Sequence, residues 1–337
     1  MSESIFVNIA SFCDPVLSFT LESLFDTVDN PENIVVGVVD QNKESIAGWL
    51  AQKPFAHQVR YLHIDPVHSR GACWARHLAQ TLYDNEDYYL QVDSHTWFEP
   101  KCDKILIEQL ERLKQYSKKP IVTAYPGGFT FENNKPIKTI TNNTDILAFK
   151  VKPDQTLTED NCTLGFKGIF HKPSDCTTSS SLFFSLGFHL AGGFIFTKGD
   201  FVKEIPYDPQ FYFSGEEQNL ALRAFTHGWD LFHPQYHYIP LCHLYKSQGQ
   251  ESQGLHWRKD IEEDRKIKWT ERHAVAKKRL CALIAGKLEK PYGLGNERSL
   301  EDYAACSNIN YSTFTIGEHP LILIETFLNN AQYSKVV

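Results

Sequence analysis

The first 125 residues alternate between short apolar runs and stretches with helical spacing. Unbroken apolar runs predict buried strands, because a strand covered on both faces loses the alternation of a half-exposed strand. They lie at 5–11, 34–40, 59–64, 88–93 and 120–125. Apolar residues recur at helical spacing over 15–28, 69–83 and 102–116, and Ser69 is an expected N-cap. The pattern predicts an α/β fold with a mostly parallel central sheet covered by helices on both faces.

Polar side chains follow the predicted strands at the ends where parallel sheets bind ligands. Ser11 and Asp14 follow the first strand, and Asp40 and Asp93 close two others. Ligands of such sheets bind beyond the carboxyl ends of the strands. We therefore expect a functional site at this edge.

The pattern changes after residue 126. Residues 127–185 are rich in Asn, Thr, Ser and Lys, which predicts inserted antiparallel strands and loops. Residues 188–197 return to strand character and contain Gly192 and Gly193, and glycines inside a strand mark a close approach of a ligand or of backbone. Beyond these we expect a helix over 215–227, an extended segment over 236–245 and a long charged helix over 260–285. We divide the chain into 1–126, 127–258 and a helical extension at 259–337.

Composition narrows the class of protein. The 337 residues are 42% hydrophobic and 22% charged, which favours a folded core. A net charge of −7 argues against nucleic acid as a partner. We expect no transmembrane segment and no signal peptide. The eight cysteines are dispersed without a CxxC pair, which favours reduced thiols and a cytoplasmic location.

Asp93-Ser94-His95 is the main candidate for chemistry. Residues i and i+2 of a strand share a face, so the carboxylate of Asp93 and the imidazole of His95 can coordinate one divalent cation. The alternative is a polar strand end at which Asp93 caps a turn. A third ligand has to come from a distant segment, and His233, His237 and His243 are available; each is otherwise a hydrogen-bonded structural histidine.

Two further segments carry charge at predicted helix starts. At the start of the helix predicted over 69–83, Arg70 could bind a phosphate. The alternative is that Arg70 forms a structural ion pair with Asp93 or Glu99. Glu216 and Glu217 follow Gly215. Acids in a first turn suit the helix dipole, although one of them could bind substrate hydroxyls or an acceptor proton.

Taken in order, six motifs resemble one known family. They are Ile9–Pro15 (Ile-Ala-Ser-Phe-Cys-Asp-Pro), Ser69–Arg76 (Ser-Arg-Gly-Ala-Cys-Trp-Ala-Arg), Asp93-Ser-His95, Gly215-Glu-Glu217, Cys242-His-Leu-Tyr245 and Tyr292-Gly-Leu-Gly295. The chain is similar over roughly residues 5–310 to the UDP-GlcNAc:polypeptide α-N-acetylglucosaminyltransferases, which modify hydroxyproline in protists and have bacterial relatives. It resembles polypeptide GalNAc transferases more distantly. The resemblance implies a GT-A-type fold, with residues 1–126 as the nucleotide-binding half and 127–258 as the half for the donor sugar and acceptor.

The resemblance also implies roles for particular residues. Asp93, His95 and His243 are expected to bind Mn²⁺ or Mg²⁺. The expected donor-site residues are Ala10, Ser11 and Asp14 near uridine, with Asp40 at its strand end, and Arg70, Gly192, Gly193, Glu216 and Glu217 near the sugar. Of these, Glu216, Glu217 and Arg70 are the expected catalytic side chains. Phe12-Cys13 departs from the Tyr-Arg frequent in the family, which puts some nucleotide contacts in doubt.

The expected activity is a retaining transfer of GlcNAc from UDP-GlcNAc to a hydroxyl of a protein or glycan. No unambiguous nucleophile stands out, so front-face attack is favoured over double displacement. Three alternatives remain: another UDP-sugar donor or a surface-polysaccharide acceptor, a noncatalytic nucleotide-sugar-binding protein, and a metal-dependent hydrolase of nucleotide sugars.

Overall fold

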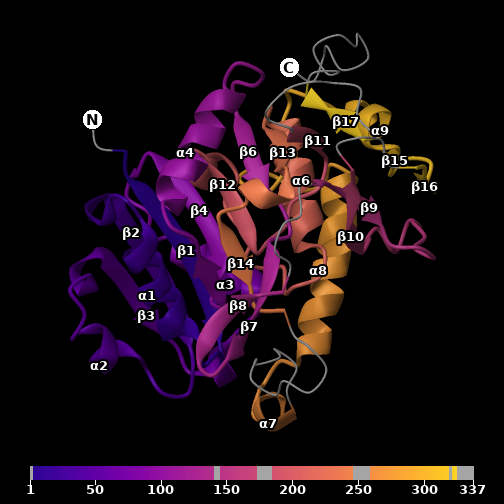
Figure 1. Cartoon of the computed structure of the whole chain (residues 1–337). Helices are drawn as coiled ribbons and strands as arrows, with labels where there is room; N and C mark the ends of the chain where they lie inside the picture. Colours follow the sequence, from indigo (N-terminus) through magenta and orange to yellow (C-terminus); the bar gives the residue numbers. More distant parts are fainter. Residues whose placement is uncertain (1–2, 140–144, 173–183, 246–258, 319–320, 325–337) are drawn as a thin grey trace.

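A nine-stranded sheet runs through the centre of the molecule (Figure 1). The computed structural model describes residues 3–139, 145–172, 184–245, 259–318 and 321–324. The strands of the sheet are, in spatial order, β17 (Ile322–Leu323), β11 (Phe184–Gly187), β13 (Asp230–Pro234), β6 (Pro120–Thr123), β12 (Phe194–Lys198), β4 (Tyr88–Asp93), β1 (Ile5–Phe12), β2 (Ile34–Gln41) and β3 (Val59–His63).

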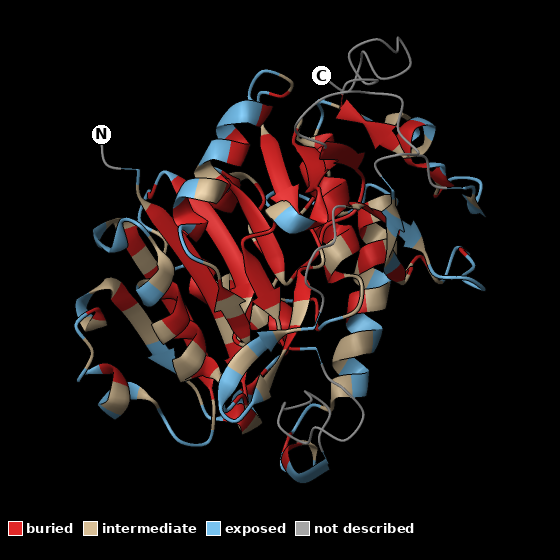
Figure 2. Cartoon of the chain, in the orientation of Figure 1, coloured by how far each residue is buried: buried red, intermediate tan, exposed pale blue. Residues whose placement is uncertain are grey.

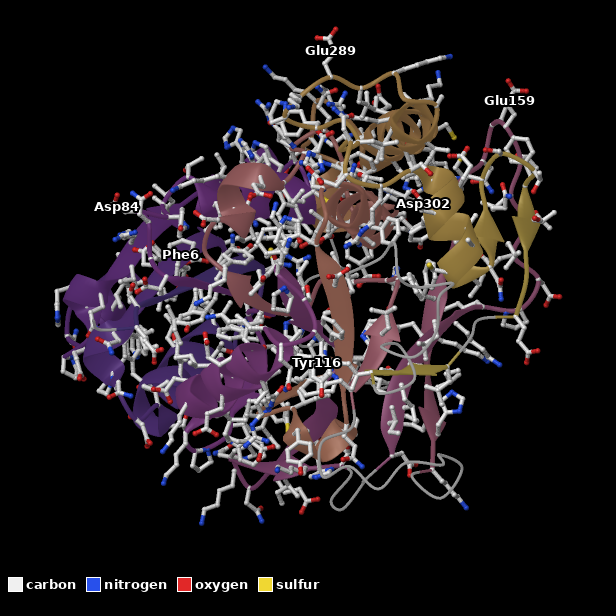
Figure 3. The ribbon with its side chains drawn as sticks, turned by 90° about the horizontal axis from the view of Figure 1, so that it is seen from above. Phe6, Asp84, Tyr116, Glu159, Glu289 and Asp302 are labelled. Carbon is white, nitrogen blue, oxygen red and sulfur yellow. The ribbon has the colours of Figure 1, made fainter. Side chains whose placement is uncertain are left out.

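The strands β4, β1, β2 and β3 form the parallel part of this sheet, as the apolar runs predict. Figure 2 shows β4, β1 and β2 as largely buried and the edge strand β3 as partly exposed, with exposed surface on the outer sides of the helices around them. Phe6 on β1 is fully buried and lies amid the N-terminal strands and helices in the view from above (Figure 3). The helices near these strands are α1 (Leu17–Thr27), α2 (Ala47–Leu50), α3 (Ala72–Gln80) and α4 (Cys102–Leu113). The predicted α/β class with a largely parallel sheet is confirmed.

The middle of the sheet is mixed, which the sequence did not indicate. Strand β12 lies between β4 and β6 and is antiparallel to both. The insertion therefore returns a strand to the centre of the sheet and separates β6 from the parallel group. Gly192 and Gly193 were expected inside this strand, but they lie in the turn that precedes it, where Ala191 bridges to Phe194.

The region after residue 126 contains the expected antiparallel strands. Two hairpins form from β7 (Gly127–Glu132) with β8 (Lys135–Lys138) and from β9 (Ile146–Val151) with β10 (Phe166–His171). Glu159, in the connection from β9 to β10, projects at the periphery of the molecule (Figure 3). A second sheet has the order β5-β14-β7-β8, with β5 at Thr96–Phe98 and β14 at Leu241–His243.

Two helix predictions need correction. Ser69 is not the N-cap of α3, which starts at Ala72 after Gly71, a residue at φ 101°. Tyr212 O would lie 2.4 Å from a Cβ at position 71, so close packing as well as φ requires glycine there. The charged helix predicted over 260–285 is two helices, α7 (Lys259–Glu262) and α8 (Trp269–Ile284). It breaks where the buried Arg265 bonds to the carbonyl of Pro66.

The remaining elements are α5 (Phe201–Glu204), α6 (Glu216–Thr226), α9 (Leu300–Ser307), β15 (Ile309–Asn310) and β16 (Thr315–Ile316). Of the extended segment predicted over 236–245, only β14 is a strand, because Tyr236–Tyr238 forms a 3₁₀ turn. Among the described helices, none combines the length and the apolar character that a membrane crossing requires. The seven cysteines in the described residues are free thiols. The three-part division of the chain stays a prediction.

Candidate active site and metal centre

Asp93, His95 and His243 meet at the carboxyl end of β4. One ligand atom from each lies within 4.8 Å of the other two. His243 Nε2 is 3.0 Å from Asp93 Oδ2, and the rings of His95 and His243 are 4.5 Å apart. The strand ends at Asp93, and His95 reaches the cluster through a turn rather than through the pleat that the sequence suggested. The side-chain oxygens of Asp93 contact Arg76 and His243 rather than the following turn, so the turn-cap alternative is wrong.

Strand pairing explains how His243 reaches residues 150 positions away. Strand β14 runs antiparallel to β5, with His243 opposite Thr96. Leu244 N donates to His95 O at 3.0 Å, which fixes the register of the two histidines. The two other candidates lie elsewhere: His233 is buried and bonds to Thr123 O, and His237 stacks on Tyr238. His233 therefore matches the structural alternative, whereas His237 is an exposed side chain outside the cluster.

Asp14 forms a second layer behind His95. Its Oδ2 accepts from His95 Nδ1 at 2.7 Å and from Ser94 Oγ at 2.6 Å, and its Oδ1 accepts from Val16 N at 3.0 Å. The hydrogen bond to Asp14 fixes the ring so that Nε2 is the nitrogen that would bind a metal. Asp14 thus orients a ligand, in addition to lining a cavity described below.

The charge states of this cluster suit a cation. Burial raises the pKa of Asp93, but Arg76 and the hydrogen bond from His243 outweigh burial and hold that pKa well below its ordinary value. Burial lowers the pKa of His243, so its imidazole is neutral and able to act as a ligand. His243 Nδ1 is buried without a hydrogen-bond partner. A carboxylate and two imidazoles fit a divalent transition-metal ion.

A buried arginine joins this cluster to a second carboxylate. Arg76 Nη2 lies 2.5 Å from Asp93 Oδ1, and Arg76 Nη1 bonds to Glu216 Oε1. Tyr207 donates to the same Glu216 oxygen at 2.7 Å. Burial raises the pKa of Glu216, although Arg76 and Tyr207 oppose that rise. Arg76 therefore sits between two carboxylates that would otherwise repel each other.

The turn before β12 passes close to both carboxylates. A Cβ at Gly192 would lie 2.7 Å from Arg76 Nη1, and one at Gly193 would lie 2.8 Å from Asp93 Oδ2. The close approach at these glycines is made by side chains of the site itself, and not by the ligand or backbone that the sequence suggested. Gly192 N also donates to Glu217 Oε1 at 2.8 Å.

Glu217 holds a different set of partners from its neighbour Glu216. Its Oε2 lies 3.2 Å from His189 Nε2 and 3.4 Å from the hydroxyl of Tyr125. The side chain is 32% exposed, against 5% for Glu216. Glu217 is therefore the more accessible of the two acids, at the floor of a cavity.

Two cavities flank the metal cluster. One, of 660 Å³, lies beyond the ends of β1 and β2 and is lined by residues including Cys13, Asp14, Asn42, Ser45, Trp49 and Ile261. The other, of 390 Å³, is lined by residues including Arg76, Asp93, Tyr125, His189, Gly192 and Glu217. Asp14, which bonds to His95, lines the first cavity and Asp93 lines the second, so the cluster lies next to both.

Arg70, one of the predicted site residues, lies away from the contacts described above. Arg70 is exposed and lies over the ring of Trp74, 5.6 Å from its centroid. The ion pairs suggested for Arg70 do not form, since Asp93 pairs with Arg76 and Glu99 pairs with Lys138, while its role at the donor site stays a prediction.

The other predicted donor-site residues stay close to the strand ends. Asp40 is buried and accepts from Tyr61 at 2.5 Å and from Asn42 N at 3.0 Å. Ala10 pairs in register with Asp93, and Ser11 pairs with Asp40. None of these three residues lines either cavity.

Sequence reasoning missed much of the second cavity. Arg76 lies in the Ser69–Arg76 motif, but the pattern favours Arg70 as the anion-binding residue because Arg70 is nearer the predicted helix start. His189, Tyr125 and Tyr207 gave no signal, because each is a single polar group in an apolar surrounding. A buried arginine at a core-facing helical position was the available clue.

Comparison with known proteins adds the family. A family model described as glycosyltransferase (GlcNAc) matches residues 4–55 and 47–318. The chain belongs to this glycosyltransferase family. A search of curated proteins finds none that matches.

Solved structures resemble this glycosyltransferase in fold. The crystal structure of GalNAc-T7 with UDP, GalNAc and Mn²⁺ superposes with a TM-score of 0.57 at 13% identity, covering 94% of this chain and 52% of that one. S. aureus TarS 1-349 in complex with UDP-GlcNAc gives a TM-score of 0.43 at 11% identity, covering 82% and 71% of the two chains. This chain thus spans about half the length of GalNAc-T7, and the shared architecture is the GT-A fold.

Proposed function

We propose that this glycosyltransferase transfers N-acetylglucosamine from UDP-GlcNAc to a hydroxyl of a protein or glycan, with retention of configuration. The observation that carries the proposal is the convergence of Asp93, His95 and His243 between two cavities. The family description, which names GlcNAc, supports the sugar. The UDP and Mn²⁺ in the GalNAc-T7 structure support the type of donor and metal. The order of motifs supports the polypeptide-modifying branch of the family.

The metal would be held by Asp93, His95 and His243. When bound, a divalent cation would stabilise the negative charge of a diphosphate leaving group. The neutral imidazole of His243 and the ionised Asp93 are in the required states already. Asp14 holds the ring of His95 in place, so little reordering is needed on binding.

The two cavities suggest a division of the donor. The 660 Å³ cavity beyond β1 and β2 would take the nucleoside, with Asp14 and Asn42 on its wall. The 390 Å³ cavity would take the sugar, with Glu217 able to accept hydrogen bonds from its hydroxyls. Arg70, Asp40, Ala10 and Ser11 would then act at the periphery of the donor site or through neighbouring residues.

The carboxylates of α6 favour front-face attack over a covalent intermediate. Glu216 is buried and bonded to Arg76 and Tyr207, and Glu217 is bonded through both oxygens. A carboxylate held by several donors is a weak nucleophile. In the front-face route the acceptor hydroxyl attacks from the side that the leaving group vacates, and its proton passes to the departing phosphate. A glycosyl ester trapped on Glu216 or Glu217 would rule this route out.

A donor panel tests the proposal. Purified protein is mixed with UDP- and GDP-sugars, with and without Mn²⁺, and released nucleotide is measured. We expect Mn²⁺-dependent release of UDP from UDP-GlcNAc, faster once an acceptor is present, and an α-linked product by NMR. If no acceptor accelerates the release of UDP, the protein is a hydrolase. If the protein binds UDP but shows no turnover with any member of a broad acceptor panel, it is a binding protein.

A further inference from the structure

Arg76 forms charged pairs both with Asp93 of the metal cluster and with Glu216, which lines the 390 Å³ cavity proposed for the sugar, hereafter the sugar cavity. It lies on α3 with its side chain 7% exposed. One guanidinium nitrogen is 2.5 Å from Asp93 Oδ1, and the other bonds to Glu216 Oε1. The remaining nitrogen, Nε, is buried without a hydrogen-bond partner. Its two terminal nitrogens are thus committed to two carboxylates from different elements.

This arrangement treats the two oxygens of Asp93 differently. Arg76 occupies Oδ1, whereas Oδ2 faces His243 Nε2 at 3.0 Å. We infer that Arg76 is a positioning residue that turns Asp93 so that Oδ2 alone is presented to a divalent cation, while it holds Glu216 beside the sugar cavity. The inference rests on the proposed function, because it assigns the metal to this cluster.

The residues around Arg76 leave room for its planar guanidinium group. Gly192 leaves space beside Nη1 that a Cβ would fill, at 2.7 Å. The ring of Tyr207 lies 6.0 Å from the guanidinium carbon, and its hydroxyl shares Glu216 with Arg76. Gln91 fixes that hydroxyl by donating to it at 2.7 Å and also donates to Gly192 O at 2.6 Å. A guanidinium reaches two acids in fixed directions, which the single ammonium of lysine cannot reproduce.

Positioning and simple charge balance make opposite predictions for Arg76→Lys. If Arg76 only neutralised two acids, lysine would keep the charge and Mn²⁺ affinity would stay near that of the wild type. If Arg76 fixes the direction of Asp93, lysine loses the fork and affinity falls. Replacing an outer-layer partner of a metal ligand typically lowers metal affinity by about 10- to 100-fold.

The test measures Mn²⁺ binding by the full chain from the electron paramagnetic resonance signal of free Mn²⁺, with no donor sugar present. Arg223→Lys is the matched control, because Arg223 is also fully buried but bonds to the carbonyls of Pro206 and Pro291. We expect Arg76→Lys to bind Mn²⁺ about 10- to 100-fold more weakly and Arg223→Lys to bind as the wild type does. Equal affinity of folded Arg76→Lys and wild type would overturn the inference.

A second measurement does not depend on the variant folding. A crystal structure of the wild type with Mn²⁺ and UDP should show Asp93 bound to the metal through one oxygen, with the other on Arg76. Coordination through both oxygens, or an Arg76 that has left Asp93, would contradict the inference while leaving the proposed function standing. Absence of Mn²⁺ binding by the wild type would instead remove the metal site itself, and the inference with it.

Discussion

The cluster of Asp93, His95 and His243 adjoins the cavity proposed for the sugar, yet the two are built in different ways. Two of the three metal-cluster residues, Asp93 and His95, stand at the end of β4, and Asp14, in the loop after the neighbouring strand β1, bonds to His95. The sugar cavity instead takes Arg76 from α3, Glu217 from α6 and the turn at Gly192 from before β12. Strand ends give the first site a backbone frame. The second depends on hydrogen bonds between side chains from remote segments, so the two should respond differently to substitution.

The largest expected effect comes from Asp93→Ala, which removes a group shared by both sites. Loss of the metal forfeits several kcal/mol of charge stabilisation, or about a thousandfold in kcat/KM. The assay is Mn²⁺-dependent release of UDP from UDP-GlcNAc. Asp65→Ala is a suitable control, because Asp65 caps only the backbone at Val67. Near-normal turnover by a folded Asp93→Ala protein would show that the metal assignment is wrong.

His243→Ala and His237→Ala separate the metal cluster from its sequence neighbours. We expect His243→Ala to lower Mn²⁺ affinity by about 100-fold or more, since it removes a ligand rather than a supporting group. His237→Ala should leave affinity unchanged, because His237 is exposed and its ring contacts Tyr238 outside the cluster. Calorimetric titration with Mn²⁺ measures both, and the reverse order would mean that the wrong histidine was chosen.

Asp14→Asn tests the layer behind the ligands. The amide keeps the size of the side chain but weakens the charged hydrogen bond that orients His95. Mn²⁺ affinity should fall by about 10-fold, at the lower end of the range for supporting groups. Because Asp14 also lines the larger cavity, UDP binding without metal serves as a second readout. A loss of UDP binding with unchanged Mn²⁺ affinity would reassign Asp14 to the nucleoside alone.

Glu217→Gln should have the smallest effect and should leave the metal cluster intact. Replacing a charged acceptor by a neutral one weakens its hydrogen bonds by about 1 kcal/mol, or roughly fivefold in KM for the donor. Mn²⁺ affinity should match that of the wild type, since Glu217 contacts Gly192, His189 and Tyr125 rather than a metal ligand. Steady-state kinetics at saturating Mn²⁺ gives the KM. A changed Mn²⁺ affinity would mean that Glu217 influences the metal cluster as well as the sugar cavity.

The same contrast explains what the sequence could predict. Asp93 and His95 could be predicted as metal ligands because an apolar strand ends at them. His243 could be predicted because it lies between apolar residues in a histidine-rich segment. The antiparallel strand β12 was not visible as the centre of the sheet, since its partners β4 and β6 come from the first 125 residues. The sequence favoured Arg70 as the functional arginine, because it stands at a predicted helix start, where anions bind. Arg76 instead acts through a tertiary contact with Glu216, which the sequence does not reveal. Hydrogen-bond networks between distant segments leave no periodic pattern to read.

The antiparallel strand β12 has a consequence for motion. It is hydrogen-bonded to β4, which carries the metal cluster, and to β6, whose end leads to Tyr125 in the sugar cavity. Many two-lobed enzymes open and close by bending at a linker between lobes. Here the strands beneath both cavities belong to one continuous sheet, which resists such bending. Substrates should therefore enter and products leave by rearrangement of the loops above the strands, while the floor of the site stays rigid through the catalytic cycle.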